Sequence, residues 1–379
     1  MSQIEYIGAG SIEHLDSILK NFNVKKAFLV CGKKSFSNCG AELHIKKING
    51  VQFFQFNDFD NNPKIEDVNK GLQFFRQSGA DVVIAIGGGS AIDMAKIIRY
   101  FSMRNFTELN IDEMTNSAAV NTEYQPPLVV IPTTSGSGSE ATSFAVMYVN
   151  KKKYSIEDNS ILPDGVIIDP LLSMSLSPYN TAVTGMDALC HAVESYWSIN
   201  STNESKGYAK EAIKSILDNL IETVHNPTGE LRFNMAKAAN LAGKAINISK
   251  TTAAHAVSYS LTAHFAIPHG LAVSMFIPYL YNYNYKVTEK DIDDSRGVEY
   301  VKQTINELNH FFNGKDCDDT SIIIEGIIKK LGLVTNLSSY GIKNSDINLI
   351  LENINNQRLK NNPRRIGKEE VKKMLELRM

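Results

Sequence analysis

The sequence lacks long hydrophobic runs and any strong excess of one charge. Its 39 Lys and Arg residues nearly balance its 41 Asp and Glu residues, so no global basic field exists to hold nucleic acid or an anionic membrane. No apolar run approaches the roughly 20 residues of a membrane span, and the N-terminus lacks the basic and apolar regions of a secretory signal. We therefore expect a cytoplasmic protein that binds neither nucleic acid nor membranes. Any anion would have to be bound by a local group of residues, because the chain has almost no net charge.

Cysteine is scarce as well. The chain has Cys31, Cys39, Cys190 and Cys317, which form neither a CxxC pair nor a spacing typical of a disulfide framework. Free thiols in a reducing compartment are the expected state. The Walker phosphate-binding pattern is also missing, because no glycine-rich loop ends in Gly-Lys-Ser or Gly-Lys-Thr.

Two domains are the natural expectation for 379 residues, because a single hydrophobic core rarely grows that large. In the first half, short apolar runs alternate with helical stretches, which favours a parallel α/β sheet. The expected buried strands are residues 27–30, 81–86 and 128–131. We place this α/β domain at residues 1–179.

The second half changes character after about residue 180. Long periodic segments rich in Ala, Leu, Ile and Lys predict helices, and these segments are residues 209–220, 231–245 and 318–331. Three prolines within residues 162–179 predict an irregular crossing between the halves. The polar, basic tail at residues 355–379 predicts a solvated terminal helix. The second domain is therefore expected to be helical and to span residues 180–379.

A glycine-rich turn follows the strand expected at residues 81–86. It reads Gly87-Gly88-Gly89-Ser90 and leads into a helical pattern. Glycines at such a turn let the backbone approach a ligand, and the helix start presents free N–H groups and a positive dipole to a phosphate. We interpret the turn as a pyrophosphate cradle, with a turn chosen only for tightness as the alternative. Residues 8–10, Gly-Ala-Gly, mimic part of a dinucleotide fingerprint, but the third glycine is missing and no adequate strand is expected before them.

A second loop supports the cradle. The strand expected at residues 128–131 leads into the segment PTTSGSGSE, residues 132–140. Its hydroxyls and flexible backbone suit hydrogen bonds to a ribose, a phosphate or a nicotinamide amide. Two such loops make a purely structural role less plausible.

Four side chains further along the chain suit a divalent metal. Asp187 and His191 stand four residues apart in a helical context and therefore share one face. His255 lies in a helical run, and His269 is expected where one helix gives way to another. One carboxylate and three imidazoles match the ligands of Fe(II) or Zn(II). Any one of these histidines alone would suggest a structural role, but the four together, after two nucleotide loops, indicate a metal site.

The segments GGGSAIDMAK, PTTSGSGSEAT, GMDALCHAVE and IPHG occur in this order. In their order and separation they resemble the iron-containing alcohol dehydrogenases, over nearly the whole chain. The resemblance implies a dehydroquinate synthase-like fold, with an N-terminal Rossmann-like sheet domain, a C-terminal helical domain and a cleft between them. It also implies a homodimer that uses Fe(II) or Zn(II) with NAD(H) or NADP(H). In such an enzyme the metal polarises the oxygen of a small aldehyde while the nicotinamide hydride reduces its carbon.

The resemblance also assigns residues. The implied metal ligands are Asp187, His191, His255 and His269. The implied cofactor contacts are Gly87, Gly88, Gly89, Ser90, Asp93, Thr133, Thr134, Ser137 and Lys153. His264 matches no ligand of the family and is expected to be structural.

One position departs from the family pattern. Many members carry a further histidine four residues after the one that matches His255, and this chain has Tyr259 there. At this spacing the ring should face the same cleft as His255. Tyr259 then orients substrate, relays a proton or only fills space, and the sequence leaves these alternatives open.

Gly32 bears on the choice between NADH and NADPH. Relatives selective for NAD typically place an aspartate at this position, where it hydrogen-bonds the ribose hydroxyls and repels a 2′-phosphate. Gly32 removes that repulsion, and Lys33 or Lys34 would attract the phosphate. We therefore expect NADPH to be accepted or preferred; ordinary surface lysines are the alternative.

The segment before His255 bears on the substrate. It offers Lys244, Lys250 and neighbouring hydroxyls, where general alcohol dehydrogenases of the family tend to have small or apolar residues. A hydroxyl-rich helix start supplies N–H groups and dipole for an anion, and a lysine adds a full charge. The stretches KAINISKTTAAHAVSYSL and DALCHAVESYWS resemble the phosphonoacetaldehyde reductase branch, in which the phosphonate would sit on Lys250, with Lys244 as a second contact. Solvated lysines and a neutral substrate, as in butanol or 1,3-propanediol dehydrogenases, are the alternative.

Three other kinds of protein are alternatives to an aldehyde reductase. Glycerol dehydrogenases and the lyase dehydroquinate synthase have the same architecture, but the lyase's motif set is not seen in this sequence. A non-catalytic nucleotide or metal sensor is disfavoured because every expected ligand is present. Oxidation of NAD(P)H with a panel of short aldehydes is expected only for a reductase and therefore separates it from these alternatives.

Overall fold

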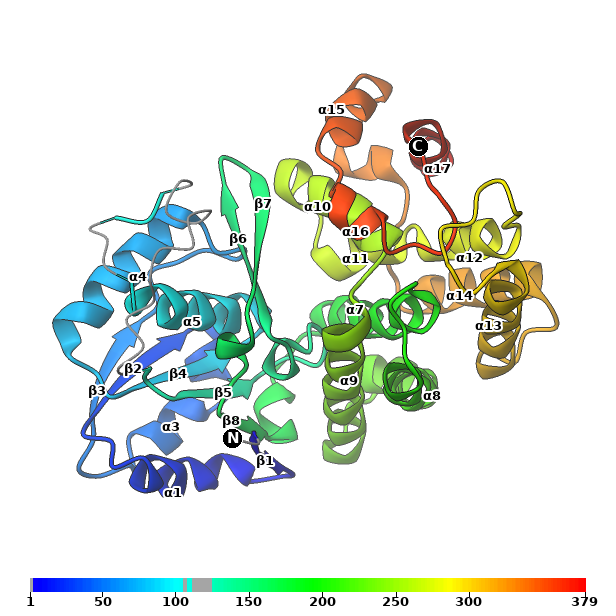
Figure 1. Ribbon diagram of the computed structural model, residues 1–379. Helices are drawn as coiled ribbons and strands as arrows, with labels where there is room; N and C mark the ends of the chain where they lie inside the picture. Colours follow the sequence, from blue (N-terminus) through cyan, green and yellow to red (C-terminus); the bar gives the residue numbers. More distant parts are fainter. Residues whose placement is uncertain (1–2, 105–107, 111–124) are drawn as a thin grey trace. The chain divides into compact units, whose positions relative to one another are not determined.

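The computed structural model describes residues 3–104, 108–110 and 125–379 (Figure 1). The chain divides into two compact units. The first comprises Met1–Leu176 with Thr228–Lys237, and the second comprises Ser177–Pro227 with Ala238–Met379. Helix α9 (Gly229–Ser249) contributes to both units, because its first turns, up to Lys237, cluster with the first.

A six-stranded parallel sheet forms the centre of the first unit, in the order β1-β8-β5-β4-β2-β3. The strands are β1 (Ile4–Ile7), β2 (Lys26–Cys31), β3 (Gln52–Phe56), β4 (Val82–Gly87), β5 (Leu128–Pro132) and β8 (Gly165–Ile168). The three strands expected from the sequence are β2, β4 and β5, which lie side by side with β8 in the interior of the sheet. The predicted parallel α/β fold is confirmed.

Both faces of this sheet are buried. Along β4, Val83 and Ala85 join one hydrophobic cluster, while Ile84 and Ile86 join another, because successive side chains of a strand point to opposite faces. The sheet is accompanied by α1 (His14–Asn21), α2 (Ser35–Asn38), α3 (Ala41–Ile45), α4 (Ile65–Ser78) and α5 (Gly89–Ser102). An antiparallel hairpin of β6 (Phe144–Val149) and β7 (Lys152–Glu157) follows β5.

The named secondary-structure elements of the second unit are all helices, and the predicted helical second half is confirmed. The helices expected at residues 209–220, 231–245 and 318–331 are α8, α9 and α14. Besides α9, the helices are α7 (Pro178–Trp197), α8 (Asn203–His225), α10 (Ala253–Phe265), α11 (His269–Ser274), α12 (Ile277–Tyr285), α13 (Val298–Phe311), α14 (Cys317–Lys330), α15 (Ile347–Glu352), α16 (Asn356–Leu359) and α17 (Lys368–Glu376). No helix in the described part of the chain is both long and apolar enough to span a bilayer.

Three local predictions were wrong. Residues 162–179 are not simply an irregular crossing, because they contain β8, whose four residues are all buried in the sheet. The tail at residues 355–379 forms two helices, α16 and α17, and α17 buries Val371, Met374 and Leu375 instead of being solvated. A strand, β1, does precede Gly8, although the third glycine of the fingerprint is still missing. In each case strand pairing or packing with distant parts of the chain determined the secondary structure of a segment whose local composition looked irregular or polar.

Candidate metal centre and nucleotide loops

The two glycine and hydroxyl loops meet at the ends of neighbouring strands. β4 ends at Gly87, Gly88 precedes α5, and the helix begins at Gly89. Thr133 donates its backbone N–H to the Gly87 carbonyl at 2.9 Å. A Cβ atom at Gly89 would lie only 2.9 Å from Ser137 Oγ, so a side chain at this position would force the second loop to shift.

The other predicted cofactor residues gather around these loops. Asp93, one turn into α5, accepts hydrogen bonds from the Ser139 hydroxyl at 2.6 Å and from the Val146 backbone N–H at 3.1 Å. Burial raises the pKa of Asp93, and the charges of Lys96 and Lys153 oppose that rise. Asp93 thus fastens α5 to the second loop and to the hairpin that carries Lys153.

Gly32 also belongs to this group. It follows β2, the neighbour of β4 in the sheet, and its backbone nitrogen would be 3.8 Å from a Cβ at Gly87. The structure therefore brings together the predicted nucleotide residues from β2, α5, the second loop and β7. Their contact with a cofactor stays a prediction.

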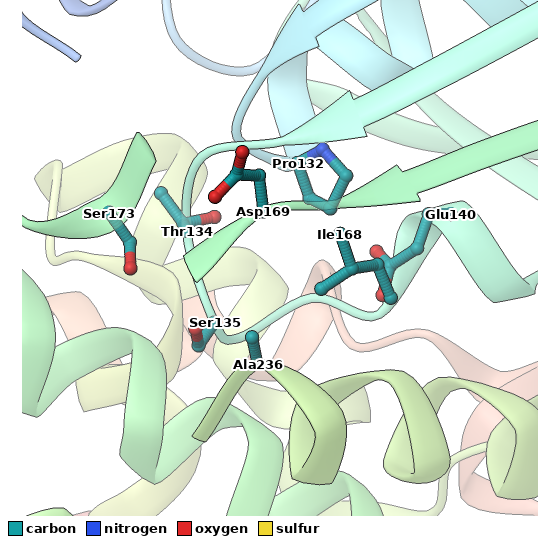
Figure 2. A pocket seen from close by; sticks show the side chains of 8 residues that line it. All are labelled: Pro132, Thr134, Ser135, Glu140, Ile168, Asp169, Ser173 and Ala236. Atoms are coloured by element: carbon teal, nitrogen blue, oxygen red, sulfur yellow. The ribbon is translucent and has the colours of Figure 1, made fainter. Parts of the chain in front are cut away.

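A small cavity of mixed polarity is lined in part by residues of the second loop. Figure 2 shows that its lining combines hydroxyls and carboxylates with apolar side chains. The lining residues are Pro132, Thr134, Ser135, Glu140, Ile168, Asp169, Ser173 and Ala236. Its volume is about 10 Å³, which is room for about one water molecule. The cavity is therefore too small to hold a nucleotide.

The four predicted metal donors converge in the second unit. Asp187 and His191 lie on α7, His255 on α10 and His269 at the first position of α11. Candidate ligand atoms of Asp187, His191 and His255 all lie within 4.8 Å of one another. Asp187 Oδ1 is 3.8 Å from His255 Nε2 and 4.0 Å from His269 Nε2. These four residues span 82 positions of the sequence, from Asp187 to His269, and the packing of α7, α10 and α11 brings them together.

The donor atoms suit a divalent cation. Asp187 Oδ1 and His255 Nε2 are buried and accept or donate no hydrogen bond within the described residues, although unsatisfied buried polar atoms are costly. The His191 and His255 rings stack with their centroids 4.5 Å apart. Two protonated imidazoles would repel each other at this distance, so the stacking favours neutral rings, the form that binds a metal. Three imidazoles and one carboxylate match the nitrogen and oxygen preference of Fe(II) and Zn(II).

Glu194 is a member of this site that sequence reasoning did not assign. It is fully buried and forms a hydrogen bond with Nδ1 of His255. The carboxylate therefore fixes the ring so that Nε2 faces the other donors. Burial raises the pKa of Glu194, but its interactions with His255 and Thr252 outweigh burial and hold the pKa below the usual value. The signal in the sequence was its place three residues after His191, which puts it on the same side of α7.

Glu194 also caps the N-terminus of α10. Its Oε1 accepts hydrogen bonds from the Thr252 hydroxyl at 2.7 Å and from the Ala254 backbone N–H at 2.8 Å. The prediction that these N–H groups would receive the anion of a substrate was therefore wrong. The protein's own carboxylate occupies the helix start.

Tyr259 lies beside the metal donors, as its spacing predicted. Its ring stacks on His269 at 5.6 Å and meets His255 edge-on at 6.5 Å. A side-chain hydrogen bond joins Tyr259 to Thr251. Tyr259 is only 7% exposed, so its hydroxyl is held in place within the second unit.

Lys250 and Lys244 lie on the segment before α10. Lys250 adopts a left-handed backbone with φ of 64°, between the end of α9 and the start of α10, and its Nζ donates to the Asn247 carbonyl at 3.3 Å. Lys244 is half-buried on α9. Their contact with a substrate stays a prediction. His264 lies in the last turn of α10, five residues beyond Tyr259.

Comparison with known proteins decides the family. The family model described as "Iron-containing alcohol dehydrogenase" matches residues 3–170, and that described as "Fe-containing alcohol dehydrogenase family, C-terminal" matches residues 181–379. The chain belongs to the iron-containing alcohol dehydrogenase family. Members of this family use a metal and NAD(P) to interconvert alcohols and aldehydes, so the chain is an oxidoreductase of this type.

Individual relatives cover almost the whole chain. An NADPH-dependent butanol dehydrogenase of Clostridium saccharobutylicum is 32% identical over 98% of this chain and 95% of its own. The crystal structure of sulfoacetaldehyde reductase from Bifidobacterium kashiwanohense in complex with NAD+ is 26% identical, covers 99% of this chain and 96% of that one, and has a TM-score of 0.86. An iron-containing alcohol dehydrogenase from Thermotoga maritima is 28% identical, covers 99% of this chain and 97% of that one, and has a TM-score of 0.84. The dehydroquinate synthase-like fold is thereby confirmed.

Proposed function

We propose that this alcohol dehydrogenase reduces a short aldehyde that carries an anionic group, with phosphonoacetaldehyde as the substrate and 2-hydroxyethylphosphonate as the product. The observation that carries the proposal is the placement of α10, which presents His255 and Tyr259 on one side and begins just after Lys250. A neutral alcohol has no use for a cation at that position. The likeness to a sulfoacetaldehyde reductase supports the same substrate class, because that enzyme's named substrate is a short aldehyde with an anionic group.

Asp187, His191, His255 and His269 would hold the metal, since their donor atoms fit a divalent cation. When bound, the metal would polarise the carbonyl oxygen and the nicotinamide would supply the hydride. Glu194 keeps His255 in the orientation that exposes Nε2. Tyr259, held by Thr251 and stacked on His269, orients the aldehyde beside these donors.

The alternative is a neutral short-chain substrate, as the names of the butanol dehydrogenase and of a 1,3-propanediol oxidoreductase among the relatives suggest. A panel of aldehydes decides between them. Phosphonoacetaldehyde, sulfoacetaldehyde, butyraldehyde and 3-hydroxypropionaldehyde should be compared by kcat/KM with both reduced cofactors and with Fe(II) or Zn(II) restored. A wild-type enzyme that prefers butyraldehyde would overturn the proposal. A cytoplasmic homodimer is part of the proposal and would be checked by the size of the purified protein in solution.

We further propose that NADPH is the preferred cofactor. Gly32 leaves the end of β2 without a carboxylate, and a Cβ at this position would lie only 2.2 Å from Ser35 Oγ. A hydroxyl, which carries no charge, thus lies beside the position where we expect NAD-selective relatives to have an aspartate. Lys33 adds positive charge nearby, although it pairs with Asp58 at 3.5 Å. The name of the Clostridium saccharobutylicum relative agrees with this preference.

Replacing Gly32 tests this preference. Gly32→Asp should lower kcat/KM for NADPH relative to NADH by about 10-fold or more, because a carboxylate repels the 2′-phosphate and binds the ribose hydroxyls. Gly32→Ala is the matched control, since it adds the same Cβ against Ser35 without charge. Steady-state kinetics with both cofactors give the ratio. A wild-type enzyme with a strong NADH preference, or an equal shift in both variants, would contradict the assignment.

The charge on Lys250 gives a second test. Lys250→Asn removes the charge but keeps a residue that tolerates the left-handed backbone, so it avoids the strain that alanine would add. KM for phosphonoacetaldehyde should rise by about 5- to 10-fold, as expected for one partly exposed charge partner, and KM for butyraldehyde should stay within about 2-fold. Lys244→Gln should give a smaller rise. Equal changes for both aldehydes would remove Lys250 from the substrate site.

A further inference from the structure

Arg358 is a buried cation that the sequence motifs did not single out. It lies on α16, a short helix near the end of the chain, and is only 6% exposed. Arginine is rarely buried without a functional or structural partner, because removing its charge from water is costly. Its surroundings therefore indicate what the charge is for.

The segment that carries Arg358 is fastened to the start of α10 at two points. The Asn355 backbone N–H donates to the Ala256 carbonyl at 3.2 Å, next to His255. The Asn361 side-chain amide donates to the Thr251 carbonyl at 2.9 Å. Arg358 stands between these two anchors, and Figure 1 shows α16 lying against α10. The segment that carries Arg358 is therefore held against the helix that carries the metal donor His255.

The charge of Arg358 acts on the hydroxyl of Tyr259. Burial raises the pKa of Tyr259, while Arg358 and the hydrogen bond with Thr251 act in the opposite direction. Tyr259 in turn stacks on His269. A guanidinium and a threonine hydroxyl thus both interact with a phenol that contacts the candidate metal donor His269.

These three groups have the composition of an oxyanion site. Arginine's planar fork donates two parallel hydrogen bonds to a phosphonate or sulfonate, and the two hydroxyls add further donors. The helix start that the sequence suggested for this purpose is taken by Glu194, so an anion near the metal needs another partner. In a buried site a single fixed charge also discriminates strongly, because screening is weak there.

We propose that Arg358, with Thr251 and Tyr259, binds the anionic end of the aldehyde and makes the enzyme selective for charged substrates. This inference rests on the proposed function and names the residues that would produce it. Lys250 then supplies a second positive charge, whose interaction with the anion is weaker because the side chain is partly exposed. The ligand class is a short aldehyde with a phosphonate or sulfonate group, separated from the carbonyl by one carbon.

Arg358→Gln tests the proposal in the full-length enzyme with metal restored. The variant should lose about 100-fold in kcat/KM for phosphonoacetaldehyde, the effect expected for charge-assisted hydrogen bonds, but change by less than about 3-fold for butyraldehyde. Arg358→Lys keeps the charge without the fork and should lose about 10-fold on the anionic aldehyde only. Lys360→Gln, two residues along the same segment, is the matched control and should leave both values unchanged. Sulfoacetaldehyde as a parallel substrate tells which anionic group the site prefers.

Binding provides a readout that is independent of turnover. Calorimetric titration with 2-hydroxyethylphosphonate should give a dissociation constant that rises about 100-fold in Arg358→Gln and about 10-fold in Arg358→Lys. If Arg358→Gln does not fold, Arg358→Lys decides by the same comparison. Equal losses on charged and neutral aldehydes, or unchanged binding of the phosphonate, would overturn the role of Arg358. A wild-type enzyme without preference for anionic aldehydes would instead overturn the proposed function itself.

Discussion

Asp187→Ala is expected to lose about 1000-fold in turnover while the protein still binds the reduced cofactor with nearly wild-type affinity. Polarisation of a carbonyl by a divalent cation contributes several kcal/mol to rate, which is about three decades. Asp187 supplies the carboxylate that lies near both His255 and His269. The nucleotide loops belong to the other compact unit, so their residues keep their own local structure. His269→Ala should behave in the same way.

The measurement combines steady-state turnover, metal content and cofactor binding by nucleotide fluorescence, each with and without added Fe(II) or Zn(II). His264→Ala is the matched control, because His264 lies on the same helix as His255 but is no predicted ligand. It should retain both metal and activity. Near-normal turnover of Asp187→Ala and His269→Ala after chelation would contradict a catalytic metal at this site.

Glu194→Gln is expected to weaken metal binding by about 10- to 100-fold, the usual effect of losing the partner that orients a histidine ligand. Glutamine still accepts the hydrogen bonds of Thr252 and Ala254, but it lacks the charge that holds the His255 ring. Turnover should fall at limiting metal and recover at excess metal. This recovery separates an orienting role from the role of a direct ligand.

Competitive metal titration with a chelating indicator measures the change. Tyr196→Phe is the control on the same helix, because the Tyr196 hydroxyl bonds Glu307 instead of the metal donors. It should leave the metal dissociation constant unchanged. The assignment of Glu194 fails if Glu194→Gln binds metal as tightly as the wild type.

Local pattern predicted much of the fold because the relevant forces are local. The apolar runs at β2, β4 and β5 become strands that are buried on both faces, and such strands need continuous apolar sequence. The four-residue spacing of Asp187 and His191 was sufficient to place them on one side of α7. By contrast, β8 and α17 were missed or misjudged, because pairing with β1 and β5 and burial of an apolar side outweighed proline and charge.

By itself, the sequence determined the fold class and the two glycine and hydroxyl loops, since periodicity and short motifs encode these within a few turns of chain. It also named the four candidate metal donors by residue type, whereas their convergence depends on the packing of α7, α10 and α11. Only the tertiary structure decided which other residues contact the candidate metal donors and Tyr259. Glu194 reaches His255 across 61 positions, and Arg358 stands near Tyr259 from 99 positions away. Nothing in local composition marks such partners, because a charge becomes a buried contact only when helices from distant parts of the chain pack together.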